Sequence, residues 1–164
     1  MSADLDLVDR LLADWARERP DLDATPMAVV GRVLALGQVL TARANAVLKD
    51  AGLTYSDLDV LATLRRSGSP HRLTPTALRR SVLLTSGAMT ACLNRLEARG
   101  LLTREPDADD RRVLAAALTP AGRDLADQAI GPRFVEAAEA VAGLAPDERA
   151  TLASLLRKLT LSLG

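Results

Sequence analysis

Residues 74–122 read TPTALRRSVLLTSGAMTACLNRLEARGLLTREPDADDRRVLAAALTPAG, and this stretch decides the fold. We expect a short helix over Pro75–Arg80, a tight turn, and a second helix over Ser86–Arg99. Thr85 suits the N-cap of the second helix, because its hydroxyl can accept a hydrogen bond from the unpaired amides of the first turn. Gly100 stands where a residue of left-handed conformation commonly ends a helix. The pattern predicts a helix-turn-helix unit whose second helix begins after the N-cap Thr85 and ends before Gly100.

A hairpin is expected directly after this unit. Leu101–Arg104 and Val113–Leu118 have the apolar content of short strands, and residues 105–112 between them form a charged tip. A hairpin in this position is the wing of a winged helix-turn-helix. We therefore predict a mainly α fold with a small β wing.

Helices are expected on both sides of the winged unit. Apolar residues recur at helical spacing over Asp4–Arg19, over residues 29–52 and over Tyr55–Arg66. Two more helices are expected after the wing, because Pro120 and Pro146 fit a first helical turn. The chain holds only one Trp, one Tyr and one Phe, so Leu, Val and Ala must fill the core, which favours packed helices.

The 164 residues are expected to form one compact domain in three sections. Residues 1–53 carry the N-terminal helices, namely an extra helix and a helix for the dimer scaffold. Residues 54–120 carry the winged helix-turn-helix, and residues 121–164 carry C-terminal dimerisation helices. Pro132, inside the last section, is expected to kink or break its helix.

The end helices predict a homodimer. The last helix has an apolar stripe that is too extensive to stay in water. Its members are Leu152, Leu155, Leu156, Leu159 and Leu163. Packing the end helices onto a second copy would bury such stripes. The alternative is that the ends pack only on their own domain.

The formal net charge is zero, but basic residues concentrate in the winged region. Residues 1–60 hold 6 basic and 10 acidic side chains, whereas residues 61–112 hold 10 basic and 5 acidic ones. Neutralising phosphates requires such a local excess of positive charge, and an acidic remainder limits non-specific binding. The alternative is that the arginines only cover a solvated surface.

The composition argues against several classes of protein. One cysteine, Cys92, and one histidine, His71, form neither an internal disulfide nor a structural zinc site, so no metal or cofactor is expected. The chain has no glycine-rich phosphate loop and no nucleophile beside a histidine, which argues against an enzyme. No uninterrupted apolar run reaches the roughly 18 positions of a membrane span, and the acidic start is unlike a signal peptide. We therefore expect a cytoplasmic protein that binds no membrane.

These features favour a DNA-binding regulator. The second helix is narrow enough to enter a major groove, where its hydroxyl residues can bond to phosphates or bases. Arg111 and Arg112 can reach a minor groove, and Asp110 can fix one of their guanidinium groups. The alternative is that Arg112 and Asp110 merely close a surface hairpin. The residues expected to bind DNA are Thr74, Thr76, Thr85, Ser86, Gly87, Ala88, Thr90, Asn94, Arg95, Asp110, Arg111 and Arg112.

The wing resembles that of the multiple-antibiotic-resistance regulator (MarR) family of bacterial repressors. The family motif is an Asp, any residue, an Arg, five more residues, Leu-Thr, and a Gly three residues after the Thr; residues 110–122 read DRRVLAAALTPAG. Residues 58–68, 73–76 and 85–90 resemble a urate-responsive branch with an extra N-terminal helix that bears a tryptophan, here Trp15. The resemblance implies a homodimer that binds a pseudo-palindromic operator and leaves it when a small ligand binds.

The resemblance also implies a site for a small effector, either a purine or an aromatic acid. Carried over by position, Trp15 would stack on the ligand, Asp59 would sense its negative charge, and Arg104 would pair with the anion or hold the wing. Cys92 stands where that branch has an arginine, and the loss of a guanidinium predicts a different class of ligand. From the residues alone, Trp15 also fits a core anchor.

Two further functions stay open at this point. Cys92 is either a small core residue or a thiol sensor that releases DNA on oxidation, which would make the protein a redox-sensing repressor. The second open function is that of a winged helix that binds another protein and does not bind DNA.

Overall fold

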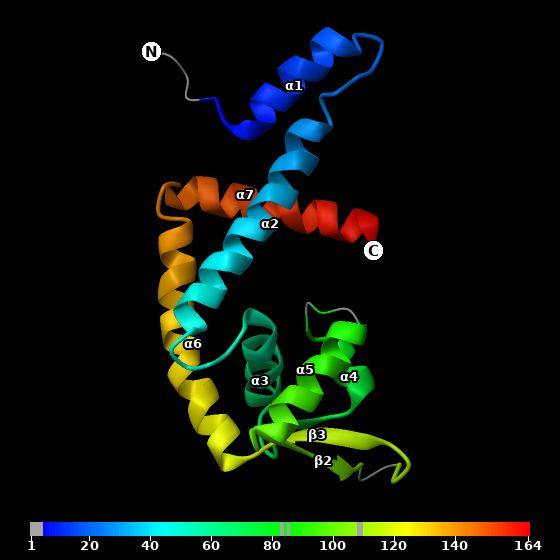
Figure 1. The fold of residues 1–164 in the computed structure, drawn as a ribbon, viewed down its shortest axis with the longest axis vertical. Coiled ribbons are helices and arrows are strands. Elements are labelled where there is room, and N and C mark those ends of the chain that lie inside the picture. Colours follow the sequence, from blue (N-terminus) through cyan, green and yellow to red (C-terminus); the bar gives the residue numbers. More distant parts are fainter. Residues whose placement is uncertain (1–4, 83, 85, 108–109) are drawn as a thin grey trace. The chain divides into compact units, whose positions relative to one another are not determined.

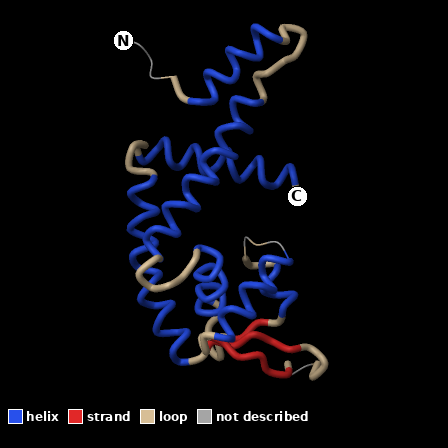
Figure 2. The backbone as a smooth tube through the Cα atoms, viewed as in Figure 1, coloured by secondary structure: helices blue, strands red, loops and turns tan. Residues whose placement is uncertain are grey.

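The computed structural model describes residues 5–82, 84, 86–107 and 110–164. In chain order its elements are α1 (Leu7–Glu18), α2 (Met27–Leu48), α3 (Tyr55–Arg66), β1 (Arg72–Leu73), α4 (Pro75–Arg79), α5 (Ser86–Ala98), β2 (Leu102–Pro106), β3 (Leu114–Leu118), α6 (Pro120–Ala140) and α7 (Pro146–Leu163) (Figure 1). They form two compact units, residues 1–43 and residues 44–164. The predicted mainly α fold with a small β wing is confirmed (Figure 2).

The first unit contains α1 and most of α2. Asp6 caps α1 by accepting from the Asp9 amide at 2.9 Å, and the Asp9 carboxylate accepts from the Asp6 amide at 3.1 Å. Arg32 of α2 donates to both carboxylates, at 2.8 Å to Asp6 and 2.6 Å to Asp9. Val8 is buried beside these ion pairs. Charge pairing and one apolar anchor therefore join the two helices of this unit.

The second unit is built around α3. Its apolar side chains, Leu58, Val60, Leu61 and Leu64, are buried, and the helix packs against α5 and α6 (Figure 1). Leucines of the other elements complete the same core, as the shortage of aromatic residues predicted. Both helices of the helix-turn-helix, α4 and α5, end one residue earlier than expected.

A three-stranded antiparallel sheet forms the wing, with β3 between β1 and β2 (Figure 2). β2 and β3 pair from Leu102 opposite Leu118 to Pro106 opposite Leu114. β1 adds Arg72 opposite Ala117. This third strand was not expected, because two residues are too short to show an alternating pattern.

Gly122 permits a close contact between α6 and the end of the helix-turn-helix. Thr119 caps α6 by accepting from the Gly122 amide at 3.0 Å, and its own amide donates to the Leu101 carbonyl at 3.2 Å. A Cβ atom at position 122 would lie 1.8 Å from that carbonyl oxygen. Packing therefore requires the glycine of the wing motif.

α6 runs without interruption through Pro132. The break that was one of the two expected outcomes does not occur. Proline removes the amide that would donate to the Gln128 carbonyl, which costs one helical hydrogen bond. Ala129 and Glu136 are buried on either side of Pro132, so packing holds both halves in one helix.

Among the described residues, α1, α2, α6 and α7 all expose large apolar side chains, and on α6 these are Phe134 and Val135. The most exposed members include Leu7, Leu11 and Trp15 of α1, Val29, Leu34 and Leu36 of α2, and Leu155, Leu161 and Leu163 of α7. Within the described residues, α2 is also long and apolar enough to cross a membrane by length and composition, despite its interrupted apolar run. A helix face that packs on another chain has the same composition.

Candidate functional site

The second helix of the helix-turn-helix, α5, turns small and hydroxyl-bearing residues outward. Gly87, Ala88, Thr90 and Asn94 are all exposed. Gly100 has a φ of 68°, which confirms the left-handed residue expected at the end of this helix. The proposed N-cap, Thr85, and the side chain of Ser86 lie outside the described residues. The exposed side of α5 is shaped for close approach to another surface.

α4 carries two more of the residues expected to bind DNA. Thr74 caps this helix by accepting from the Ala77 amide at 3.3 Å. Thr76 is exposed, and so are Arg79 and Arg80 at the end of the helix. These two arginines were not among the expected DNA contacts, although they belong to the basic excess of the winged region.

The tip of the wing extends Arg112 into solvent, and the neighbouring Arg111 is exposed as well. Arg112 donates from Nε and Nη2 to the two oxygens of Asp110 at 2.9 and 3.0 Å, and its backbone amide donates to Asp110 at 3.0 Å. The arginine holds the pKa of Asp110 below its usual value. The Arg112 side chain is nevertheless 90% exposed. The guanidinium is fixed in direction and remains accessible to an anion.

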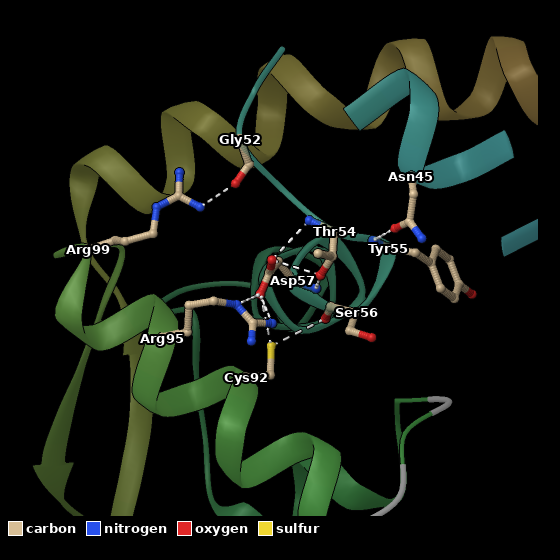
Figure 3. Close-up of polar contacts among 9 residues, drawn as sticks. All are labelled: Asn45, Gly52, Thr54, Tyr55, Ser56, Asp57, Cys92, Arg95 and Arg99. Carbon is tan, nitrogen blue, oxygen red and sulfur yellow. Dashed lines mark hydrogen bonds and ion pairs between the residues drawn. The ribbon is translucent and has the colours of Figure 1, made fainter. Parts of the chain in front are cut away.

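The inward side of α5 is anchored to α3 by a buried carboxylate (Figure 3). Asp57 lies in the first turn of α3, and its side chain is 2% exposed. Its Oδ1 atom accepts from Arg95 Nε at 3.0 Å, from Arg95 Nη2 at 2.6 Å and from Cys92 Sγ at 3.3 Å. Its Oδ2 atom accepts from the amide and the hydroxyl of Thr54, at 2.9 and 2.8 Å. Burial opposes ionisation, but the bonds from Arg95 and Thr54 hold the pKa of Asp57 below its usual value.

Cys92 is a buried hydrogen-bond donor. Burial, and then the Asp57 carboxylate, raise the pKa of the Cys92 thiol to about 12. The thiol therefore keeps its proton and can donate it to Asp57 Oδ1, and the sulfur atom also lies 3.5 Å from the Ser56 carbonyl oxygen (Figure 3).

Arg104 links the wing to α5. Its Nη2 donates to the Asn94 side-chain oxygen, and its Nε lies 3.4 Å from a Glu97 carboxylate oxygen. The same arginine lines a pocket of about 320 Å³ together with Pro75, Met89, Thr90, Leu93, Val113, Leu114 and Ala116. The pocket has an apolar lining and one cationic group, and it opens beside the exposed side of α5.

The four expected ligand residues do not all meet within one unit. Trp15 belongs to the first unit, where it is 51% exposed. Asp59 is partly buried on α3, and its charge contributes to the raised pKa of the Cys92 thiol. Cys92 turns toward Asp57, whereas Arg104 lines the pocket on the wing side of α5. The structure thus places Cys92 and Arg104 in different surroundings.

Asp57 is not among the functional residues that the sequence predicts. The local signal was present, because Thr54 and Asp57 have the spacing of a capping box, which the structure contains. Its pairing with Arg95, 38 positions later, has no local signature.

Comparison with known proteins identifies the family of this chain. A model of the MarR family matches residues 51–113, from the loop before α3 into the wing. The chain is 29% identical to the transcriptional regulator PecS of Dickeya dadantii over 152 residues, which are 93% of this chain and 92% of PecS. This match spans nearly the whole chain and confirms the predicted likeness to the urate-responsive branch.

Two further proteins extend the comparison. The chain is 32% identical to the multiple antibiotic resistance protein MarR of Salmonella typhimurium over 116 residues, covering 70% of this chain and 78% of that protein. The structure of Bordetella bronchiseptica BpsR, whose DNA binding is regulated by 6-hydroxynicotinic acid, aligns with a TM-score of 0.74 and 28% identity, covering 82% of this chain and 94% of BpsR. These relatives are regulators and not enzymes, in agreement with the expectation from the sequence. The chain belongs to the MarR family of DNA-binding transcriptional regulators.

Proposed function

We propose that this protein is a repressor that binds a pseudo-palindromic operator as a homodimer and leaves it when a small aromatic anion binds. The proposal rests on one observation: the second unit presents both the exposed side of α5 and the cationic tip of the wing. The exposed side of α5 has small residues and the Thr90 hydroxyl, which suit a major groove, and Arg112 is held 90% exposed at the wing, which suits a minor groove. Arg104, through Asn94, ties these two surfaces together.

The homodimer is supported by apolar surface that the single chain leaves in water. α7 buries none of its residues, and Leu155 is 59% exposed. The exposed apolar side chains of α1 and α2 add to this area. Apolar stripes left in water commonly mark interaction surfaces, and a second copy would present the same stripes.

The effector is proposed to occupy the pocket lined by Arg104. An apolar lining with one guanidinium suits a flat ring that carries a carboxylate or an ionised hydroxyl. Thr90 belongs both to the lining and to the exposed side of α5. A ligand anion would compete with Asn94 and Glu97 for Arg104, so its binding would loosen the wing from α5. Only such a difference in affinity between the two states can shift DNA binding.

DNA selection tests the core of the proposal. Duplexes that the wild-type protein retains from a random pool should contain two inverted half-sites, centred about 10 base pairs apart. The spacing follows from two reading helices related by a two-fold axis. Recovery of no shared sequence, or of a single half-site bound by one chain, would contradict the proposal.

A ligand panel tests the effector pocket. Aromatic carboxylates and purines should displace the selected duplex in a fluorescence anisotropy titration, whereas the neutral amide of the same ring should not. Arg104→Met should abolish the response, and Arg99→Met should keep it, because Arg99 donates to the Gly52 carbonyl and does not line the pocket. An unchanged response of Arg104→Met would place the effector elsewhere.

A further inference from the structure

Asp57 is more deeply buried than any other charged side chain that the structure describes. Its two oxygens serve different helices (Figure 3). Oδ2 is used by Thr54 in the cap of α3, whereas Oδ1 is used entirely by α5 through Arg95 and Cys92. A carboxylate at this depth is stable only while these donors stay in place. The side chain is therefore a rigid link between the two helices.

The link holds α5 at two points on one side. Cys92 and Arg95 are three positions apart, so they lie on neighbouring turns of the same side. Thr90 and Asn94 lie on the other side of the helix from Cys92, because each residue turns an α-helix by about 100°. Any rotation of α5 that redirects Thr90 and Asn94 must also stretch the bonds to Asp57.

We propose that Asp57 is a positioning residue for DNA recognition, which sets the rotation of α5 about its axis by holding Arg95 and Cys92. Arg95 then acts through Asp57, and it does not serve as a phosphate ligand. This inference rests on the proposed function, since it assigns the residue that orients the proposed reading surface.

Met89, Leu93 and Leu96 also pack α5 into the core, and the other polar contacts of the helix lie elsewhere than this link. Arg104 connects Asn94 to β2, so it fixes α5 relative to the wing. Arg99 donates to the Gly52 carbonyl at 2.6 Å, beyond the end of α5 (Figure 3). Within the second unit, Asp57 supplies a buried charged contact between α3 and the C-terminal half of α5.

The test compares four variants, Arg95→Lys, Arg95→Met, Asp57→Asn and the double variant Asp57→Asn/Arg95→Met. Each is titrated at several salt concentrations with a duplex that the wild-type protein selected from a random pool, and with an unrelated duplex of equal length. Arg99→Lys is the matched control. Circular dichroism and thermal unfolding confirm that each variant is folded. Arg95→Lys and Arg95→Met keep Asp57 and decide the question by themselves if the Asp57→Asn chain does not fold.

Arg95→Lys is the decisive variant, because lysine keeps the positive charge but lacks the two donors that meet Oδ1. We expect this variant to bind the selected duplex roughly tenfold more weakly than the wild type does. Its affinity for the unrelated duplex and the slope of log K against log salt should not change. Asp57→Asn should have a similar effect, and the double variant should lose little more than either single one, because both act on one link. Arg99→Lys should bind like the wild type.

The opposite pattern would overturn the inference. If Arg95 contacts a phosphate, Arg95→Lys should bind like the wild type, and Arg95→Met should weaken both duplexes and lower the salt slope by about 0.9. Normal binding by both Arg95→Lys and Asp57→Asn would also refute it, with the proposed function intact. A wild-type protein that selects no duplex would refute both.

Discussion

At the scale of single residues, burial decides the chemistry of Cys92. Its place on α5 suggested either a core residue or a redox sensor. The side chain is fully buried, and burial followed by the Asp57 carboxylate raises its pKa to about 12. Because the thiolate is the reactive form, this environment favours the core residue.

We predict that the Cys92 thiol of the native protein reacts with an aromatic disulfide reagent at pH 8 on the order of 10³-fold more slowly than a small free thiol. Denaturation in urea should restore the ordinary rate. Cys92→Ser should bind DNA like the wild type, because the serine hydroxyl can also donate to Asp57. If peroxide releases the wild-type protein from DNA but not Cys92→Ser, the redox-sensing function would be the correct one.

The ionised state of Asp57 predicts a dependence of stability on pH. Its pKa is lower in the folded chain than in the unfolded one, so its contribution is complete above the ordinary carboxyl pKa, about 3.9, and is lost as the pH falls through the folded value. Urea unfolding at pH 7 and at pH 3 should show a smaller acid-induced loss of stability for Asp57→Asn than for the wild type. Equal losses would show that Asp57 has the same pKa in both states.

Gly122 predicts a steric cost. In Gly122→Ala the new methyl group would overlap the Leu101 carbonyl, so the free energy of unfolding should fall by about 3 kcal/mol. Gly37→Ala is the control, since a Cβ atom at that helical position meets no atom within 4 Å. It should be neutral or slightly stabilising by thermal unfolding. An unchanged or increased free energy of unfolding in Gly122→Ala would show that the contact with Leu101 does not require a glycine at position 122.

At the scale of elements, the wing is held at its base and presented at its tip. Arg104 connects its strand β2 to α5, and Arg112 is fixed by Asp110 near the turn. Arg104 therefore positions the wing relative to α5, and Arg112 supplies a positive charge at its tip.

The tip makes a separate prediction about DNA affinity. Arg112→Ala should weaken operator binding about tenfold and lower the slope of log K against log salt by about 0.9, because one phosphate-neutralising charge is lost. Asp110→Asn is the matched variant, because it keeps Arg112 but removes the carboxylate that orients the guanidinium. It should weaken binding less and keep the slope. If Arg112→Ala and the wild type show the same dependence of DNA affinity on salt, then Arg112 and Asp110 only close the hairpin and Arg112 does not contact DNA.

At the scale of the whole molecule, the exposed stripe on α7 predicts the state of assembly. Light scattering at micromolar concentration should give the mass of a dimer for the wild-type protein. Leu155→Glu places a charge in the stripe and should shift the mass toward the monomer and weaken operator binding. Ser154→Glu is the control, because that residue is exposed on another side of the helix. A monomeric wild-type protein would contradict the proposed homodimer.

The sequence by itself determined the elements whose signals are local. The residue at the end of α5 was predicted from Gly100, and the start of α6 from Pro120, because a cap or a first turn depends on neighbouring atoms. The wing motif was also readable, and its glycine has a steric reason at Gly122.

Only the tertiary structure decided the contacts between distant positions. It paired β1 with β3, kept α6 continuous across Pro132, and brought Arg95 and Cys92 to Asp57. Hydrogen bonds and burial in these places depend on which segments meet after folding. A sequence pattern reports the preferences of a segment, whereas the energy of a buried charge depends on all the groups around it.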